Sequence, residues 1–126
     1  MPNDQQSLIL NVDDSEAMRY AKGRALTNAG FDVIEAATGK SALEIVEQSK
    51  PALLVLDVNL PDINGLTACR QVVQAHPEIK VIVFTAADDP DTRRRAFEAG
   101  ACAVVDKVEF GGELLSTLRR LDSARH

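Results

Sequence analysis

Short apolar runs alternate along this chain with longer segments in which apolar residues recur every three or four positions. The apolar runs have the length of β-strands and occupy residues 8–12, 31–36, 53–56, 81–84 and 102–105. The longer segments have the spacing of amphipathic helices. The first runs from about 16 to 29, and the second has its apolar face at 42–46 and stops before Pro51. The other three run from 66 to His76, from Pro90 to near Gly100, and over 114–121. The pattern therefore predicts five strands and five helices in alternation.

Strands that alternate with helices are typical of βαβ units and a parallel sheet. The run 53–56 is apolar throughout, which indicates a central strand covered on both faces, whereas 31–36 alternates as an edge strand does. We therefore predict an α/β fold with a five-stranded, parallel, doubly wound sheet, five helices and the flavodoxin-like strand order 2-1-3-4-5. With 126 residues, 45% of them hydrophobic, we expect a single domain over residues 1–126.

Four of the five predicted strands lead directly into residues suited to phosphoryl transfer. These residues are, in strand order, Asp13 with Asp14, then Asp57, Thr85 and Lys107. In a parallel sheet such positions share one edge, and right-handed crossovers with a reversal of strand order bring the ends of the first and third strands together. A single aspartate after a strand is usually a turn residue or a helix cap, so the prediction of a site depends on the whole set.

Three carboxylates at one edge repel one another unless a cation lies among them. Oxygen ligands with room for water and phosphate suit Mg²⁺, and the crowding therefore predicts a magnesium site. A divalent cation and a nearby ammonium group stabilise the oxygens of a transferring phosphoryl group, so that a carboxylate can attack in line. Asp57, at the end of the predicted central strand, is the natural nucleophile.

Four motifs occur in the order of the predicted strands. They are Val12-Asp13-Asp14-Ser15, the segment from Leu56 to Gly65, Phe84-Thr85-Ala86 and Val105-Asp106-Lys107. Together they resemble the receiver domain of two-component response regulators, in which an acidic pair, a phosphoacceptor aspartate, a threonine or serine and a lysine end strands one, three, four and five. The resemblance covers almost the whole chain, and the combination of motifs is specific to that family.

The resemblance implies that Asp57 takes a phosphoryl group from a sensor histidine kinase or a histidine phosphotransfer protein. Thr85 and Lys107 would bind the phosphoryl oxygens. The expected chemistry is self-phosphorylation and slow self-dephosphorylation in a phosphorelay that signals through protein–protein contacts, without turnover of a small substrate.

The resemblance also implies a set of metal ligands and a docking surface. Mg²⁺ would be bound by Asp57, Asp14 and the backbone carbonyl of Asn59, and Asp13 would reach it mainly through water. In the family, the face made by the fourth helix, the fifth strand and the fifth helix carries partner and dimer contacts. We therefore expect a downstream protein or a second copy of the chain to bind there.

Two positions depart from the family pattern. Val104 stands where the family often has tyrosine or phenylalanine, a ring that moves inward as the threonine hydroxyl turns toward the phosphoryl group. Val108 stands where a proline commonly follows the lysine through a cis peptide bond. A non-proline cis bond costs roughly 3 kcal/mol, so we expect a trans bond and a looser loop after Lys107. Phosphorylation should survive, with a weaker or different conformational readout.

Composition excludes several classes of partner. The formal net charge of −5 provides no basic surface for a nucleic-acid backbone. No apolar run approaches the ~20 residues of a membrane span, and the start of the chain lacks the features of a signal peptide, so we expect a cytoplasmic protein without membrane contact. Cys69 and Cys102 have no CxxC pairing and lie in apolar stretches, so we expect both to be buried, reduced thiols.

Two local patterns have simpler explanations than a ligand site. Thr38-Gly39-Lys40-Ser41 resembles the end of a phosphate-binding P-loop, but Ile34 stands where the first glycine belongs. The arginines at 93–95 resemble a polyanion site, but a charge run on a helix is usually a solvated face, and neighbouring acidic residues offset it. We interpret this run, with Arg119 and Arg120, as part of the docking surface.

Two alternative functions stay open from the residues alone. A Mg²⁺-dependent phosphohydrolase can also use an aspartyl-phosphate, but it usually has a second aspartate two residues after the nucleophile, where this chain has Asn59. A receiver-like interaction module that is never phosphorylated normally lacks one of the key residues, and this chain has all of them. Because the sequence has no output domain, we expect either a stand-alone regulator or a receiver from a longer protein such as a hybrid kinase.

Overall fold

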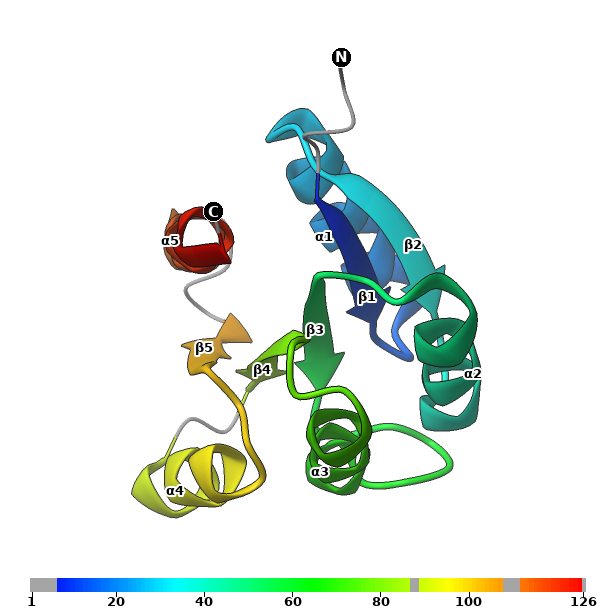
Figure 1. Ribbon diagram of the computed structural model, residues 1–126, viewed down its shortest axis with the longest axis vertical. Helices are drawn as coiled ribbons and strands as arrows, with labels where there is room; N and C mark the ends of the chain where they lie inside the picture. The colour runs from blue at the N-terminus through cyan, green and yellow to red at the C-terminus, as the bar shows by residue number, and fades with distance from the viewer. Residues whose placement is uncertain (1–6, 87–88, 108–111, 126) are drawn as a thin grey trace.

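Strands and helices alternate as the hydrophobic pattern predicts, in a computed structural model that describes residues 7–86, 89–107 and 112–125 (Figure 1). The strands are β1 (Leu8–Val12), β2 (Asp32–Ala36), β3 (Leu53–Asp57), β4 (Lys80–Thr85) and β5 (Ala103–Asp106). The helices are α1 (Glu16–Asn28), α2 (Gly39–Ser49), α3 (Gly65–Ala75), α4 (Pro90–Glu98) and α5 (Gly112–Arg125). Neighbouring strands are parallel in the order β2-β1-β3-β4-β5, which confirms the predicted fold class.

Helices cover both faces of the sheet, α1 and α5 on one side and α2, α3 and α4 on the other (Figure 1). The side chains of β3 alternate between the two cores: Leu53 and Val55 pack with the α1 and α5 layer, and Leu54 and Leu56 with the opposite layer. Every residue of β3 is buried, as predicted for the central strand. β2 forms an edge of the sheet, again as predicted.

Helix boundaries follow the local sequence. Each N-cap side chain accepts a hydrogen bond from a backbone N–H of the first turn, and these caps are Ser15, Thr38, Asn64 and Asp89. Pro90 occupies the first position of α4, as the sequence predicts. Gly30, directly after α1, has a φ of 100°, a left-handed conformation that glycine adopts readily. Within the described ranges, no helix has both the length and the apolar character needed to cross a membrane.

Asp62 accepts hydrogen bonds from the backbone N–H groups of the P-loop-like segment at residues 38–41. Its two carboxylate oxygens accept hydrogen bonds from the backbone N–H groups of Gly39 and Lys40, each at 2.8 Å. A phosphate at the N-terminus of α2 would require these same donors. The bonds lower the pKa of Asp62, and they tie the start of α2 to the loop that follows β3.

The two cysteines differ in their surroundings, so the expectation that both are buried is wrong for Cys102. Cys69 is fully buried in α3, and its thiol lies 3.6 Å from the carbonyl oxygen of Ala99. Cys102 is exposed, because β5 begins one residue later than the apolar run and Cys102 lies in the connection before it. Burial raises the pKa of the Cys69 thiol to about 11.

We therefore expect only Cys102 to react with a thiol reagent in the native protein near pH 8. A raised pKa and full burial leave Cys69 without accessible thiolate. Mass spectrometry after labelling with iodoacetamide should show one modified thiol in the native state and two after denaturation. A Cys102→Ser variant that is still labelled rapidly without denaturant would contradict this assignment.

Candidate functional site

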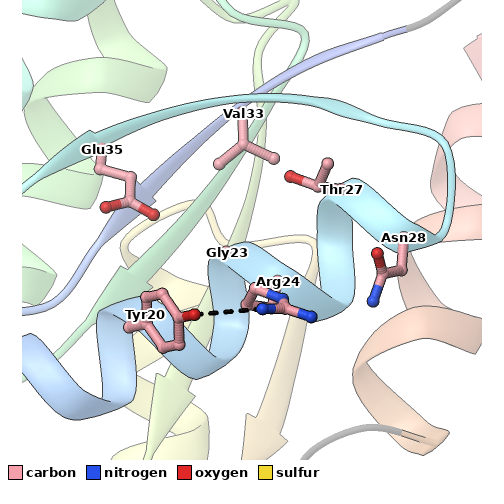
Figure 2. Close-up of a pocket in the computed structure, with 7 residues that line it drawn as sticks. All are labelled: Tyr20, Gly23, Arg24, Thr27, Asn28, Val33 and Glu35. Carbon is pink, nitrogen blue, oxygen red and sulfur yellow. Dashed lines mark hydrogen bonds between the residues drawn. The ribbon is translucent and has the colours of Figure 1, made fainter.

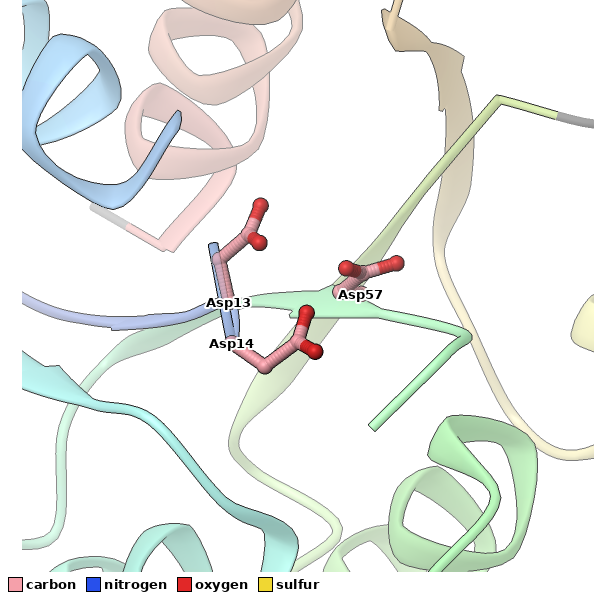
Figure 3. Close-up of side chains that lie close together, drawn as sticks. All are labelled: Asp13, Asp14 and Asp57. Atoms are coloured by element: carbon pink, nitrogen blue, oxygen red, sulfur yellow. The ribbon is translucent and has the colours of Figure 1, made fainter. Parts of the chain in front are cut away.

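The three aspartates predicted at the edge of the sheet lie close together (Figure 3). Asp13 and Asp14 follow β1, Asp57 ends β3, and these two strands are hydrogen-bonded neighbours. One carboxylate oxygen from each aspartate lies within 4.8 Å of the others. Asp13 and Asp57 are buried and Asp14 is exposed, so the cluster opens to solvent on the side of Asp14.

Asp57 is a buried carboxylate with two donors. It is 2% exposed, its Oδ1 accepts a hydrogen bond from the Asn59 backbone N–H at 3.1 Å, and its Oδ2 accepts one from Lys107 Nζ at 3.1 Å. Burial raises the pKa of Asp57 above its ordinary value, and the Asp13 charge adds to this, while the Asn59 and Lys107 bonds oppose it. The two donors hold both oxygens of the carboxylate in place.

Asp13 has no solvent exposure and is held by both main chain and side chains. Its Oδ1 accepts a hydrogen bond from the Ser15 backbone N–H at 3.0 Å, and its backbone carbonyl accepts one from Arg19 Nη1 at 2.8 Å. Its Oδ2 lies 3.3 Å from Lys22 Nζ and 3.8 Å from Lys107 Nζ. Asp13 is therefore the carboxylate of the cluster that is paired with two ammonium groups.

Thr85 and Lys107 come to the same edge from the next two strands. Thr85 is the last residue of β4 and is 1% exposed. Its neighbour Phe84 is in register with Asp57 across the β3–β4 pair. Lys107 directly follows β5, and its ammonium group reaches back across the edge to Asp57. The structure thus brings the three aspartates and Lys107 into contact distance and places Thr85 at the end of β4, the strand next to β3.

The loop after β3 contributes backbone groups and a hollow beside the acidic cluster. Asn59 donates its N–H to Asp57 and pairs with Asn64 across the loop. Together with Asp14 this loop lines a hollow of about 510 Å³. The role of the Asn59 carbonyl as a metal ligand stays a prediction.

Gly65 allows α3 to begin directly behind the phosphoacceptor candidate. A Cβ atom at this position would lie 2.1 Å from the Asp57 carbonyl oxygen and 2.8 Å from Val58 Cα. Both are backbone atoms, which cannot move without displacing the end of β3. The Gly65 N–H also donates to the Val58 carbonyl oxygen at 2.8 Å. The close approach therefore requires glycine.

Lys22 belongs to the site and is absent from the residues that the sequence predicts. It lies in α1 and has no solvent exposure, and burial lowers its pKa to about 8 although the Asp13 carboxylate opposes the shift. The available signal was its spacing, because Met18, Lys22 and Leu26 form one stripe at four-residue intervals, and a lysine among apolar residues there faces inward. The spacing alone does not indicate which strand end that stripe covers.

The donor set fits a hard divalent cation. Three carboxylates offer oxygen ligands, which Mg²⁺ and Ca²⁺ prefer. Asp13 Oδ2 is fully buried without a hydrogen-bond donor among the described residues, although a buried carboxylate oxygen ordinarily has one. The acidic cluster can therefore hold a metal ion, with Asp14 at its open side.

A second hollow lies between α1 and β2 (Figure 2). Its volume is about 270 Å³, and its rim includes Tyr20, whose hydroxyl accepts a hydrogen bond from Arg24 at 3.1 Å. Val33 and Glu35 of β2 line the opposite wall. None of the site residues predicted from the sequence lines this hollow, so it is separate from the acidic cluster.

An open parallel sheet that gathers buried carboxylates, a threonine and a lysine at one edge defines an α/β domain with a candidate phosphoacceptor site. The model of the response regulator receiver domain family matches residues 9–119. The chain therefore belongs to that family and is a receiver domain, a signalling module of two-component systems.

Relatives and solved structures agree with this assignment. The response regulator MprA of Mycobacterium leprae is 38% identical over 113 residues, which are 90% of this chain and 50% of that protein. The chain thus spans about half the length of the curated relatives it matches. A putative response regulator from Chloroflexus aurantiacus superposes with a TM-score of 0.88 at 30% identity, covering 94% of this chain and 98% of its own. The BeF3-activated DrrB receiver domain superposes with a TM-score of 0.85 at 30% identity, and the match covers 92% of this chain and 97% of that one.

We expect Gly65→Ala to destabilise the protein by about 2–3 kcal/mol, because the added methyl group would overlap backbone atoms behind Asp57. Urea unfolding followed by circular dichroism measures the change. Gly112→Ala is the matched control, since an added Cβ there meets no atom within 4 Å. If both variants unfold at the same urea concentration as the wild type, the packing argument for Gly65 is wrong.

Proposed function

We propose that Asp57 is the phosphoacceptor of this receiver domain and that it works with a bound Mg²⁺ ion. The observation that carries the proposal is the position of Asp57 at the end of the buried central strand, among three carboxylates and 3.1 Å from the Lys107 ammonium. Burial raises the pKa of Asp57 and the Lys107 ammonium opposes that shift, so positive charge beside Asp57 favours its ionised, nucleophilic form.

The metal ligands in this proposal are Asp13, Asp14, Asp57 and the backbone carbonyl of Asn59. Asp14 is exposed at the open side of the cluster, where an entering ion first meets the protein. When bound, Mg²⁺ supplies positive charge to the acidic cluster and to the oxygens of an entering phosphoryl group. Asp13 Oδ2 forms ion pairs but has no hydrogen bond among the described residues, which supports a further donor or ion at this point.

The transfer itself is a displacement at phosphorus. An Asp57 carboxylate oxygen forms a bond to phosphorus as the bond from phosphorus to the donor's imidazole nitrogen breaks, and the electron pair of that bond leaves with the imidazole. Lys107 then pairs with the phosphoryl oxygens in place of the carboxylate, and Thr85 donates its hydroxyl to them. Water later attacks the same phosphorus and releases phosphate, which restores the Asp57 carboxylate.

The proposed partners are a sensor histidine kinase or a histidine phosphotransfer protein, and a downstream protein or second copy that binds the α4, β5 and α5 face. On α4, Arg94 and Arg95 pair with Asp91, so this surface carries mixed charge. Phe97 is 45% exposed there, which supports a protein contact. We further propose that residues 1–126 form one receiver domain in the cytoplasm, where the thiols of the unpaired Cys69 and Cys102 stay reduced.

We expect one phosphoryl group to be added when the protein is incubated with Mg²⁺ and acetyl phosphate, because the donor is itself a small acyl phosphate. Intact-protein mass spectrometry detects the product. A chelator and the Asp57→Asn variant should each abolish the added phosphoryl group. Asp32→Asn should not, because Asp32 is the first residue of β2 and lies at the end of that strand away from the acidic cluster. A folded wild type that stays unmodified would contradict the proposal, as would modification that persists in Asp57→Asn.

We also propose that phosphorylation changes β5 and α5 less than in receivers with a switch aromatic. Val104 is 4% exposed and packs in the core beside α4, and it has no ring to move inward beside Thr85. The expected trans peptide bond after Lys107 falls on Val108, which lies outside the described residues, and it stays a prediction.

In ¹H–¹⁵N spectra, we expect phosphorylation to shift resonances around Asp57 and Thr85 and to leave most of α5 unchanged, because Val104 cannot transmit the change as a ring does. Val104→Tyr restores the aromatic residue, and its spectra should change over a wider part of β5 and α5. Equally wide changes in the wild type and in Val104→Tyr would show that the readout does not depend on this position.

A further inference from the structure

Lys22 is a buried cation beneath the acidic cluster. Its side chain has no solvent exposure, and its Nζ lies 3.3 Å from Asp13 Oδ2, which is equally buried. The 3.3 Å contact is an ion pair, and neither atom has a well-aligned hydrogen bond among the described residues. Burying an ammonium group is costly unless an opposite charge accompanies it. The position of Lys22 therefore depends on the negative charge of the site.

Lys22 and Lys107 both lie near one aromatic ring beside the cluster. Lys22 Nζ lies 4.6 Å and Lys107 Nζ 5.9 Å from the centroid of Phe84, the residue before Thr85. Both ammonium groups also lie within 4.0 Å of Asp13 Oδ2, at 3.3 and 3.8 Å. Lys107 is partly exposed and contacts Asp57, whereas Lys22 is enclosed and contacts Asp13. The site thus contains two cations that share Asp13, and of the two only Lys107 also pairs with Asp57.

We propose that Lys22 is a second cation of the phosphoacceptor site, a positioning residue that holds Asp13, weakens Mg²⁺ binding to the unphosphorylated site and favours the phosphorylated, metal-loaded site. The inference rests on the proposed function of Asp57 and Mg²⁺, and it adds a residue that the family motifs do not contain.

The charges of the site give the direction of the effect. Three carboxylates and two ammonium groups leave one net negative charge, whereas the same site without Lys22 would carry two. A divalent cation therefore meets less attraction when Lys22 is present. Phosphorylation replaces a singly charged carboxylate by a group with about two negative charges. With Mg²⁺ bound, the phosphorylated site is then neutral with Lys22 and negative without it.

Lys22 consequently favours the phosphorylated, metal-loaded site over the unphosphorylated, metal-loaded one. In the unphosphorylated protein, its charge competes with Mg²⁺ for Asp13. In the phosphorylated protein, the same charge offsets the added negative charge. Removing Lys22 should therefore tighten Mg²⁺ binding and lower the fraction of protein phosphorylated at saturating Mg²⁺.

Titration calorimetry of the unphosphorylated protein with Mg²⁺ tests the inference. We expect Lys22→Met to bind Mg²⁺ about three- to tenfold more tightly than the wild type, from the loss of one nearby positive charge. Lys22→Arg keeps the charge and should bind as the wild type does. Lys80→Met is the matched control, because Lys80 is the first residue of β4 and lies at the end of the strand away from the acidic cluster. The Mg²⁺ affinity of this variant should equal that of the wild type.

Lys22→Gln provides a second neutral variant if Lys22→Met does not fold. If neither folds, the ammonium resonance of Lys22 in the wild type decides, since it should shift with Mg²⁺ along the same binding curve as Asp14. An unshifted Lys22 resonance overturns the inference, as do folded neutral variants with wild-type affinity and wild-type phosphorylated fraction.

The outcomes separate this inference from the proposed function. If the wild type is phosphorylated with Mg²⁺ and the Lys22 variants have the same Mg²⁺ affinity and phosphorylated fraction as the wild type, only the role of Lys22 is refuted. A wild type that neither binds Mg²⁺ nor is phosphorylated refutes the proposed function and this inference together.

Discussion

The carboxyl edge of the sheet depends on the neutralisation of buried negative charge. Asp13 and Asp57 have almost no contact with solvent, and an unpaired buried carboxylate costs several kcal/mol. Lys107 pairs with both carboxylates and Lys22 with Asp13, so the positions of two lysines from α1 and from the end of β5 are coupled to the ends of β1 and β3. Charge neutralisation is the constraint that joins four segments into one site.

The apolar interior gives that constraint a fixed frame. β3 is buried on both faces, so Asp57 cannot move away from the edge without pulling a central strand out of two cores. Gly65 lets α3 start directly behind Asp57, and the loop between them returns an N–H donor to the carboxylate through Asn59. Asp57 is thus positioned by the packing of β3 in both cores and by the backbone hydrogen bond from Asn59.

Sequence patterns were sufficient for the architecture because each strand and helix here obeys its own periodicity. The same patterns located Asp57, Thr85 and Lys107, since strand ends of a parallel sheet meet at one edge. They misplaced Cys102, because an apolar run and a strand need not begin at the same residue. They also did not identify Lys22 as a residue of the site, because periodicity indicates that a side chain faces inward but does not indicate which residues it contacts.

The sequence by itself determined the fold class, the strand order and the set of motif residues at the strand ends, because these follow from local periodicity and from the rules of parallel sheets. Only the tertiary structure decided which ion pairs form. The pairing of Lys22 with Asp13, and the capping of Gly39 and Lys40 by Asp62, join segments distant in sequence. Such contacts depend on how helices pack over the sheet, which fixes distances that no local pattern encodes.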